Sequence, residues 1–360
     1  MDPRELAGRE GGKGKSAEFL FRQGVGPWGI PTGLSAEFSA GALSAYRELR
    51  FLHGCRGVKE LSVGACLYRL FCCFNQRTKR KTEDTHMKFE HLQGSIVAMV
   101  TPFRQDGSVN FDMLTELLER QIAAGTDGIL TLGTTGEYST MSHEEDAAVV
   151  EHTIRVVDGR VPVMVGSGSN CTVTQIEKSR LYQSMGADAL LLISPYYNKA
   201  NAEGMYRHFA ETADAVDIPC ILYNVPGRTG CSIPVSVVER LARHPNIAGI
   251  KEASGDMSYA MKIARCVGPD FALYSGNDDI TVPILSIGGS GVISVYANVM
   301  PAMCRQIVAD WLDGNHARAL ENHLRYLQLM NDLFLEVNPI PVKAAMNMMG
   351  LDVGPMRLPL

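Results

Sequence analysis

The sequence predicts an α/β fold in which eight parallel strands alternate with eight helices. Three observations lead to this prediction. From Gly94 onward, short runs of apolar and β-branched residues recur along the chain, and a turn containing Gly or Pro follows each run. The segment after each turn has apolar residues three and four positions apart, as in a helix. Strands separated by helices form a parallel sheet, because each helix returns the chain to the start of the next strand.

The predicted strands are continuously apolar, which indicates a sheet that is covered on both faces. They lie at residues 96–100, 128–132, 161–165, 189–193, 219–223, 247–250, 271–274 and 291–295. The helical segments that follow them lie at residues 113–124, 143–157, 173–185, 203–216, 235–243, 258–267, 279–287 and 301–312. Eight such units in roughly 250 residues are enough to close the sheet, so we predict a (β/α)8 TIM barrel over residues 87–312.

Two further helical segments, 316–334 and 341–349, follow the eighth unit. We expect these extra C-terminal helices, within residues 313–360, to pack on the barrel or to build a subunit interface.

Residues 1–86 differ in composition from the rest of the chain. They contain 12 glycines, show no sustained hydrophobic period and close on a basic run at residues 77–81. We predict an N-terminal extension that is disordered, or that lies upstream of a native start at Met87. The alternative is a basic arm for anionic partners.

Charge and composition exclude several classes of protein. Residues 1–86 carry 14 Lys and Arg against 9 Asp and Glu, whereas the remainder carries 20 against 30. An acidic body is a poor partner for nucleic acid, and no segment approaches the roughly 20 apolar residues of a membrane-spanning helix. The nine cysteines form no C-x-x-C pair, so we expect reduced thiols and a cytoplasmic location. No His, Cys and Asp cluster has metal-ligand spacing, and we expect no metal.

The active site of such a barrel lies at the carboxyl ends of its strands. The residues that follow the predicted strands there are Gly133-Thr-Thr-Gly-Glu137, Ser194-Pro-Tyr-Tyr-Asn198, Tyr223-Asn-Val-Pro-Gly-Arg-Thr229, Lys251-Glu-Ala-Ser254 and Ser275-Gly-Asn-Asp278. We expect these segments to converge on one mouth.

Lys251 comes directly after a predicted buried strand. Burial disfavours the ammonium form and frees the neutral amine, so this lysine is a candidate for imine formation with a carbonyl substrate. The alternative is a structural lysine paired with Glu252 or Asp278. From position alone, the sequence does not decide between the two.

Other candidates surround this lysine at the predicted mouth. Tyr223 ends the neighbouring strand, where its phenol can move protons to and from a carbinolamine, although many strand-end tyrosines are core residues. Thr134 and Thr135 lie between glycines that let backbone N–H groups approach a small carboxylate. Arg228 lies in a Pro-Gly-Arg turn, where its guanidinium can bind a second carboxylate or remain solvated.

Together these motifs resemble the pyruvate-dependent class I aldolase family over residues 88–350. The motifs are the Gly-Thr-Thr-Gly-Glu, Tyr-Asn-Val-Pro-Gly-Arg-Thr and Ile-Lys-Glu-Ala-Ser segments, in this order and at this spacing. The resemblance implies a cofactor-independent lyase that condenses pyruvate with L-aspartate 4-semialdehyde in diaminopimelate and lysine biosynthesis.

The resemblance also implies a role for each site residue. Lys251 would form the Schiff base with pyruvate, while Tyr223, Thr134 and Tyr197 would form a proton relay, with Tyr197 supplied by an adjacent subunit of a homotetramer built as a dimer of dimers. The residues implied in substrate binding are Thr135, Gly276 and Ile293 for pyruvate and Arg228 for the carboxylate of the semialdehyde. Related lyases that act on N-acetylneuraminate or keto-deoxy sugar acids share the lysine and the tyrosine, so Arg228 favours the semialdehyde.

An allosteric lysine site is a further feature of some members of this family. His143, Asn170 and Tyr196 resemble its pattern, whereas the residues that depart from it are Tyr138, Asp146 and Thr174. Because Thr174 lacks a carboxylate for the amine of lysine, we predict weak or absent feedback. A second hypothesis is a catalytically silent barrel that binds a keto acid as a sensor.

Overall fold

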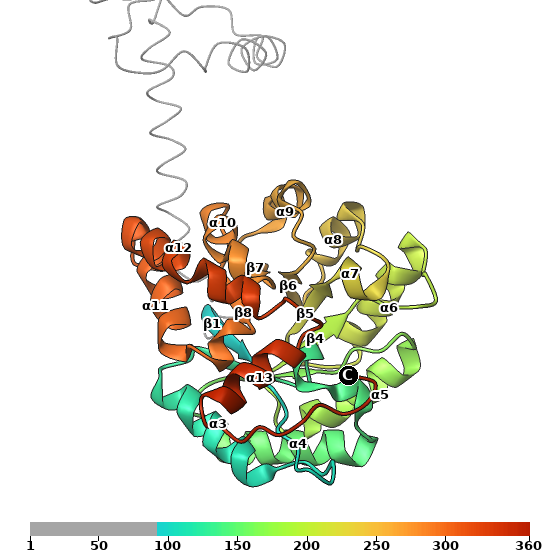
Figure 1. Cartoon of the computed structure of the whole chain (residues 1–360). Helices are drawn as coiled ribbons and strands as arrows, with labels where there is room; N and C mark the ends of the chain where they lie inside the picture. The colour runs from blue at the N-terminus through green and yellow to red at the C-terminus, as the bar shows by residue number, and fades with distance from the viewer. Residues whose placement is uncertain (1–91) are drawn as a thin grey trace, which may run out of the picture. The chain divides into compact units, whose positions relative to one another are not determined.

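A computed structural model describes residues 92–360, and the predictions made for residues 1–86 lie outside these described residues. Eight parallel strands form a closed barrel in the order β1 to β8, in which β8 pairs with β1. The predicted α/β class and barrel are therefore confirmed. Figure 1 shows the helices arranged around the outside of the strands.

The strands lie close to their predicted positions. They are β1 (Gly94–Ala98), β2 (Gly128–Thr131), β3 (Val163–Gly166), β4 (Ala189–Ile193), β5 (Cys220–Asn224), β6 (Ile247–Glu252), β7 (Ala272–Ser275) and β8 (Gly291–Ser294). The α-helices are α3 (Phe111–Ala123), α4 (His143–Val157), α5 (Thr172–Ser184), α6 (Ala202–Asp214), α7 (Pro226–Thr229), α8 (Val235–Leu241), α9 (Met257–Ile263), α10 (Thr281–Ser286), α11 (Pro301–Leu312), α12 (His316–Asp332) and α13 (Ile340–Met348).

Local sequence signals set several helix starts. The Ser142 hydroxyl accepts a hydrogen bond from the Glu145 N–H, and the Glu145 carboxylate accepts one from the Ser142 N–H, so α4 begins with a capping box. The side chain of Asn110 caps α3 in the same way at the Met113 N–H.

Two predicted helical segments each contain a 3-10 turn. The segment predicted at 279–287 divides into the 3-10 turn η5 (Asp278–Ile280) and α10. Pro283 has no N–H to donate to the carbonyl of Asp279, and that carbonyl instead accepts from His323 at 2.9 Å. The segment predicted at 258–267 forms α9 and then the 3-10 turn η4 (Ala264–Cys266).

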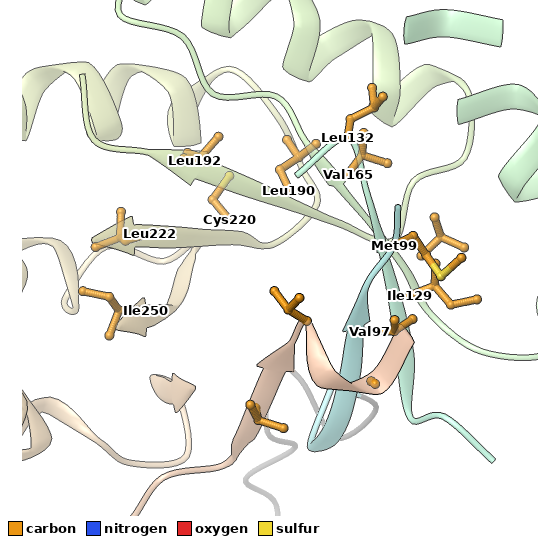
Figure 2. Packing of buried hydrophobic residues seen from close by; sticks show 14 of the residues in the cluster. Val97, Met99, Ile129, Leu132, Val165, Leu190, Leu192, Cys220, Leu222 and Ile250 are labelled. Carbon is orange, nitrogen blue, oxygen red and sulfur yellow. The ribbon is translucent and has the colours of Figure 1, made fainter. Parts of the chain in front are cut away.

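Buried apolar side chains form two layers on the two faces of the strands. The inner layer fills the barrel, and its members include Ile96, Ala98, Leu130, Met164, Leu191, Ile221, Tyr223, Ala248, Tyr274 and Ile293. The outer layer lies between the strands and the helices, and Figure 2 labels Val97, Met99, Ile129, Leu132, Val165, Leu190, Leu192, Cys220, Leu222 and Ile250 within it. The alternation along each strand explains why the strands read as continuously apolar.

The helices after the eighth strand also contact the barrel. Helix α12 packs against α11, α10 and η5, and α13 packs against the 3-10 turn η6 (Tyr296–Asn298) that follows β8. In Figure 1, α13 and the chain end after it run across the side of the barrel that carries α3 and α4. No helix between residues 92 and 360 is long and apolar enough to span a membrane.

Candidate active site

A β-bulge in β6 turns Lys251 into the barrel. Cys220 pairs with Ile247, but the next residue of β5, Ile221, pairs with Gly249, so Ala248 is an extra residue in β6. Ile247 lies in the outer layer, and regular alternation would place Lys251 there as well. The extra residue shifts the alternation by one, and Lys251 then pairs with the inward-facing Tyr223.

The sequence suggested that Lys251 is the first residue after the strand, whereas the structure includes Lys251 in β6. The side chain is 5% exposed, and its Nζ lies 4.5 Å from the centroid of the Tyr223 ring. Burial lowers the pKa of Lys251 to about 8, and the negative charge of Asp278 partly opposes this shift. A far larger share of the amine than for an ordinary lysine is thus neutral and nucleophilic near neutral pH.

Neither carboxylate named as an alternative partner forms an ion pair with Lys251 among the described residues. Glu252 accepts hydrogen bonds from Asn224 Nδ2 at 2.7 Å and from the Ser254 N–H at 2.6 Å. Its side chain therefore joins the carboxyl ends of β5 and β6 on the outer face, one residue beyond the pair formed by Tyr223 and Lys251.

Asp278 is held away from the amine by three hydrogen bonds. Its carboxylate accepts from Ser294 Oγ at 2.5 Å, from the Val295 N–H at 3.1 Å and from the Tyr296 N–H at 2.9 Å. Burial nevertheless raises the pKa of this carboxyl group. Asp278 thus lies near Lys251 as a charge rather than as a direct partner.

Tyr223 and Thr134 are brought together with Lys251. Burial raises the pKa of the Tyr223 phenol, whereas its hydrogen bond with the Thr134 side chain and the charge of Arg228 lower it. The phenol therefore remains protonated near neutral pH, and its contact with Thr134 gives a path for a proton.

Thr135 and Arg228 meet through Asn338, a residue that the sequence analysis did not identify. Asn338 Nδ2 donates to Thr135 Oγ1 at 3.0 Å, and the Asn338 carbonyl accepts from Arg228 Nη2 at 3.1 Å. Asn338 lies about 200 residues from Thr135 in the sequence, after α12, so no local pattern could have placed it there.

Gly276 and Ile293, both implied in substrate binding by the resemblance, lie in different parts of the barrel. A Cβ atom on Gly276 would lie 2.5 Å from Ala253 Cβ and 3.1 Å from Lys251 Cε, so only glycine fits beside the amine. Ile293 is fully buried in the inner layer. Among residues 92–360, no three His, Cys, Asp or Glu side chains gather as metal ligands.

Tyr197 is not brought to this site within one chain. Its side chain is 88% exposed, and its backbone is in the left-handed region at φ 71°, although tyrosine disfavours that region. The aromatic ring of Tyr197 is thus open to solvent in the single chain. The contribution of Tyr197 from a second subunit remains a prediction.

The residues named for a regulatory site lie around the start of α4 and α5. His143 is exposed at the first turn of α4, and Tyr196 hydrogen bonds with Tyr138. The carbonyl of Asn170 accepts from Asn198 Nδ2 at 2.9 Å.

Asp146, in the same region, is paired within the chain. Its carboxylate accepts from Lys178 Nζ at 2.7 Å, and only 1% of its side chain is exposed. The Lys178 ammonium also lies 5.9 Å from the centroid of the Tyr138 ring. The Lys178 ammonium is therefore already paired with the Asp146 carboxylate.

Comparisons with known proteins show the family of the chain. The model of the Dihydrodipicolinate synthetase family matches residues 91–360. A 4-hydroxy-tetrahydrodipicolinate synthase of Thermoanaerobacter sp. (strain X514) is 50% identical over 270 residues, which cover 75% of this chain and 91% of the relative. The crystal structure of dihydrodipicolinate synthase from Aquifex aeolicus is 41% identical and covers 75% of this chain and 92% of its own, with a TM-score of 0.73.

A third similar protein has been solved with a substrate-sized molecule. The chloride inhibited dihydrodipicolinate synthase from Acinetobacter baumannii, complexed with pyruvate, is 43% identical to this chain, and the match covers 75% of this chain and 92% of that one, with a TM-score of 0.73. The family model covers the barrel and the C-terminal helices alike. The chain therefore belongs to the dihydrodipicolinate synthetase family.

Proposed function

We propose that this protein is a lyase that condenses pyruvate with L-aspartate 4-semialdehyde, the 4-hydroxy-tetrahydrodipicolinate synthase activity after which its relatives are named. One observation carries the proposal: a lysine amine with a lowered pKa lies inside the barrel against Tyr223. An amine in this state reacts with a keto acid without any metal or organic cofactor.

Imine formation is the first step. The neutral Lys251 amine attacks the carbonyl carbon of pyruvate and gives a carbinolamine. Tyr223, hydrogen bonded to Thr134, donates a proton to the leaving hydroxyl group, and water departs as the C=N bond forms. Thr135, whose side chain is buried at the mouth, would bind the carboxylate of pyruvate through hydrogen bonds.

Carbon–carbon bond formation follows. Loss of a methyl proton converts the imine to an enamine, whose carbon attacks the aldehyde carbon of the semialdehyde, and the aldehyde oxygen takes up a proton. The amino group of the semialdehyde part then attacks the imine carbon and displaces the Lys251 amine, which closes the ring and restores the enzyme. The exposed Arg228 side chain would bind the carboxylate of the incoming semialdehyde.

The proposal includes a homo-oligomer, a dimer within a tetramer, in which Tyr197 of one subunit completes the relay of another. The exposure of Tyr197 in the single chain supports this. It also includes a catalytic domain at residues 87–312 with residues 313–360 as packing helices, and a cytoplasmic location. Five cysteines lie between residues 92 and 360, and all five are free, which supports the cytoplasmic location.

Borohydride trapping with pyruvate tests the function. Reduction of the imine leaves a stable adduct, and peptide mass mapping should find it on Lys251 in the wild-type protein and on no lysine of the Lys251→Met variant. Folded wild-type protein that gives no adduct would favour a silent barrel that only binds a keto acid.

The aldehyde partner is tested separately by turnover. With pyruvate present, the enzyme should consume aspartate semialdehyde and leave N-acetylmannosamine unchanged. The reverse preference would assign the chain to the sugar-acid lyases that share its lysine and tyrosine.

A further inference from the structure

The C-terminal segment after α12 binds the loop that carries Thr134 and Thr135. Lys343, on α13, is fully buried, and its ammonium donates to three acceptors: Glu137 Oε1 at 2.8 Å, the Thr101 carbonyl at 3.1 Å and the Pro355 carbonyl at 2.7 Å. All three of its N–H donors are therefore used. The acceptors belong to the loops after β1 and β2 and to the chain end.

Glu137 is the last residue of the Gly-Thr-Thr-Gly-Glu loop, and its side chain is also fully buried. Its second oxygen, Oε2, accepts from the Arg357 N–H at 3.0 Å. The backbone of Glu137 is left-handed, at φ 54°, which a residue with a side chain adopts only when its surroundings require it. The loop thus depends on contacts outside itself for its shape.

Arg357 extends the same connection along α4. Its guanidinium donates to the carbonyls of Gly107 and Thr140 and forms two hydrogen bonds with the Glu145 carboxylate, at 2.8 and 2.5 Å. The Phe103 ring lies beneath both cations, with its centroid 4.5 Å from Lys343 Nζ and 4.3 Å from the Arg357 guanidinium carbon. The C-terminal segment is therefore fixed to the residues that follow the Thr134–Thr135 turn and to the loop after β1.

We propose that Lys343 is a positioning residue, which holds the Thr134–Thr135 turn at the mouth of the barrel through its buried ion pair with Glu137. The link to catalysis rests on the proposed function, since Thr134 and Thr135 act there as proton relay and carboxylate site. Without the Lys343 ammonium, the Glu137 carboxylate has lost its charge partner, and the left-handed turn has lost the contact that opposes its relaxation. A shift of about 1 Å in such a turn is enough to impair binding and proton transfer by roughly a hundredfold.

Lys343→Met tests this, with Glu137→Gln as a milder variant that keeps the side-chain shape. Arg318→Met is the matched control, because it removes the partner of Asp310 on α11, another carboxylate with a 1% exposed side chain. We expect Lys343→Met to raise the KM for pyruvate about tenfold, and Glu137→Gln to raise it in the same direction. Borohydride titration counts the active sites that remain in each variant. Arg318→Met should lower the melting temperature and leave the KM unchanged. A merely structural role would reduce the number of active sites without changing the KM of those that remain.

Amide hydrogen exchange separates this inference from the proposed function. Exchange of residues 131–141 should be faster in Lys343→Met and Glu137→Gln than in the wild-type protein and in Arg318→Met, whether or not pyruvate is a substrate. Unchanged exchange in this segment overturns the positioning role. Absence of a pyruvate adduct in the wild-type protein, with the exchange difference present, would instead overturn only the proposed function.

Discussion

The Nζ atom of Lys251 lies 4.5 Å from the centroid of the Tyr223 ring, and the two residues are partners in neighbouring parallel strands. The contact is a consequence of the extra residue at Ala248, which turns Lys251 to the inner face, where Tyr223 lies. An ammonium against an aromatic face is stabilised by the ring, whereas burial disfavours the ammonium relative to the neutral amine. The Tyr223 ring can thus lie against both the charged and the neutral form of Lys251, and an imine-forming lysine adopts both forms.

The lowered pKa of Lys251 predicts a pH dependence. With a pKa of about 8, instead of the ordinary 10.5, about one amine in ten is neutral at pH 7, so kcat/KM for pyruvate should rise with pH and level off above about pH 8. The folded protein also binds fewer protons than the unfolded chain between these two pKa values, so this group adds to the free energy of unfolding as the pH rises through that window. Initial rates from pH 6 to 10 check the first point. A rise that continues through pH 10 would contradict it.

Replacement of Tyr223 by Phe should remove the proton relay and leave the packing. We expect kcat to fall by about 10² to 10³, with a much smaller change in the KM for pyruvate, because a proton transfer in the transition state is lost. Tyr326→Phe, on α12, is the matched control and should retain full activity. Equal losses in both variants would refute a specific role for the Tyr223 hydroxyl.

Gly276→Ala should slow formation of the pyruvate adduct by tenfold or more, about the effect of a small misplacement of the amine. The new Cβ would lie 2.5 Å from Ala253 Cβ and 3.1 Å from Lys251 Cε, so the amine must move. Gly268→Ala serves as the control, because no atom lies within 4 Å of its added Cβ. The trapping rate with borohydride measures the difference, and equal rates in the two variants would show that the amine tolerates the crowding.

Arg228→Ala should separate the two substrates. The exposed guanidinium donates one hydrogen bond within the described residues, to the Asn338 carbonyl, so its removal should cost little stability. We expect the KM for aspartate semialdehyde to rise about tenfold or more and the pyruvate adduct to form at an unchanged rate. A rise in the KM for pyruvate alone would instead place Arg228 on the first substrate.

Inhibition by L-lysine should be weak or absent. Asp146 is already paired with Lys178 at 2.7 Å, and Thr174 offers no carboxylate to a second amine. Initial rates with millimolar L-lysine, together with calorimetric titration, check this prediction. Inhibition at micromolar concentration would show that His143, Asn170 and Tyr196 bind lysine despite these changes.

The barrel could be predicted because each of its units carries a local signal. The runs at 189–193, 143–157 and 301–312 match β4, α4 and α11 to the residue, since apolar period and turn chemistry both mark their ends. The inward direction of Lys251 could not be predicted, because the apolar run Ile247-Ala-Gly-Ile250 does not show which residue is extra.

The contacts of the C-terminal segment could not be predicted from local sequence patterns either. Asn338, Lys343 and Arg357 reach loops about 200 residues earlier in the chain, and nothing in their own neighbourhood records those partners. Helical spacing predicted α13 but not which of its residues would be buried, because a lysine is rarely found without exposure. Lys343 is buried only because three acceptors from separate loops meet it there.

Closure of the barrel between β1 and β8 also governs how the protein is made on the ribosome. The first strand of the barrel, Gly94–Ala98, pairs with Gly291–Ser294, the last, and a Cβ atom on Gly291 would clash with the Gly94 carbonyl, so no side chain fits there. One edge of β1 therefore stays unpaired until nearly the whole barrel has been synthesised. A nascent chain that stalls before β8 exposes that edge to other chains, so completion of translation, rather than the stability of any single unit, decides whether the chain folds or aggregates.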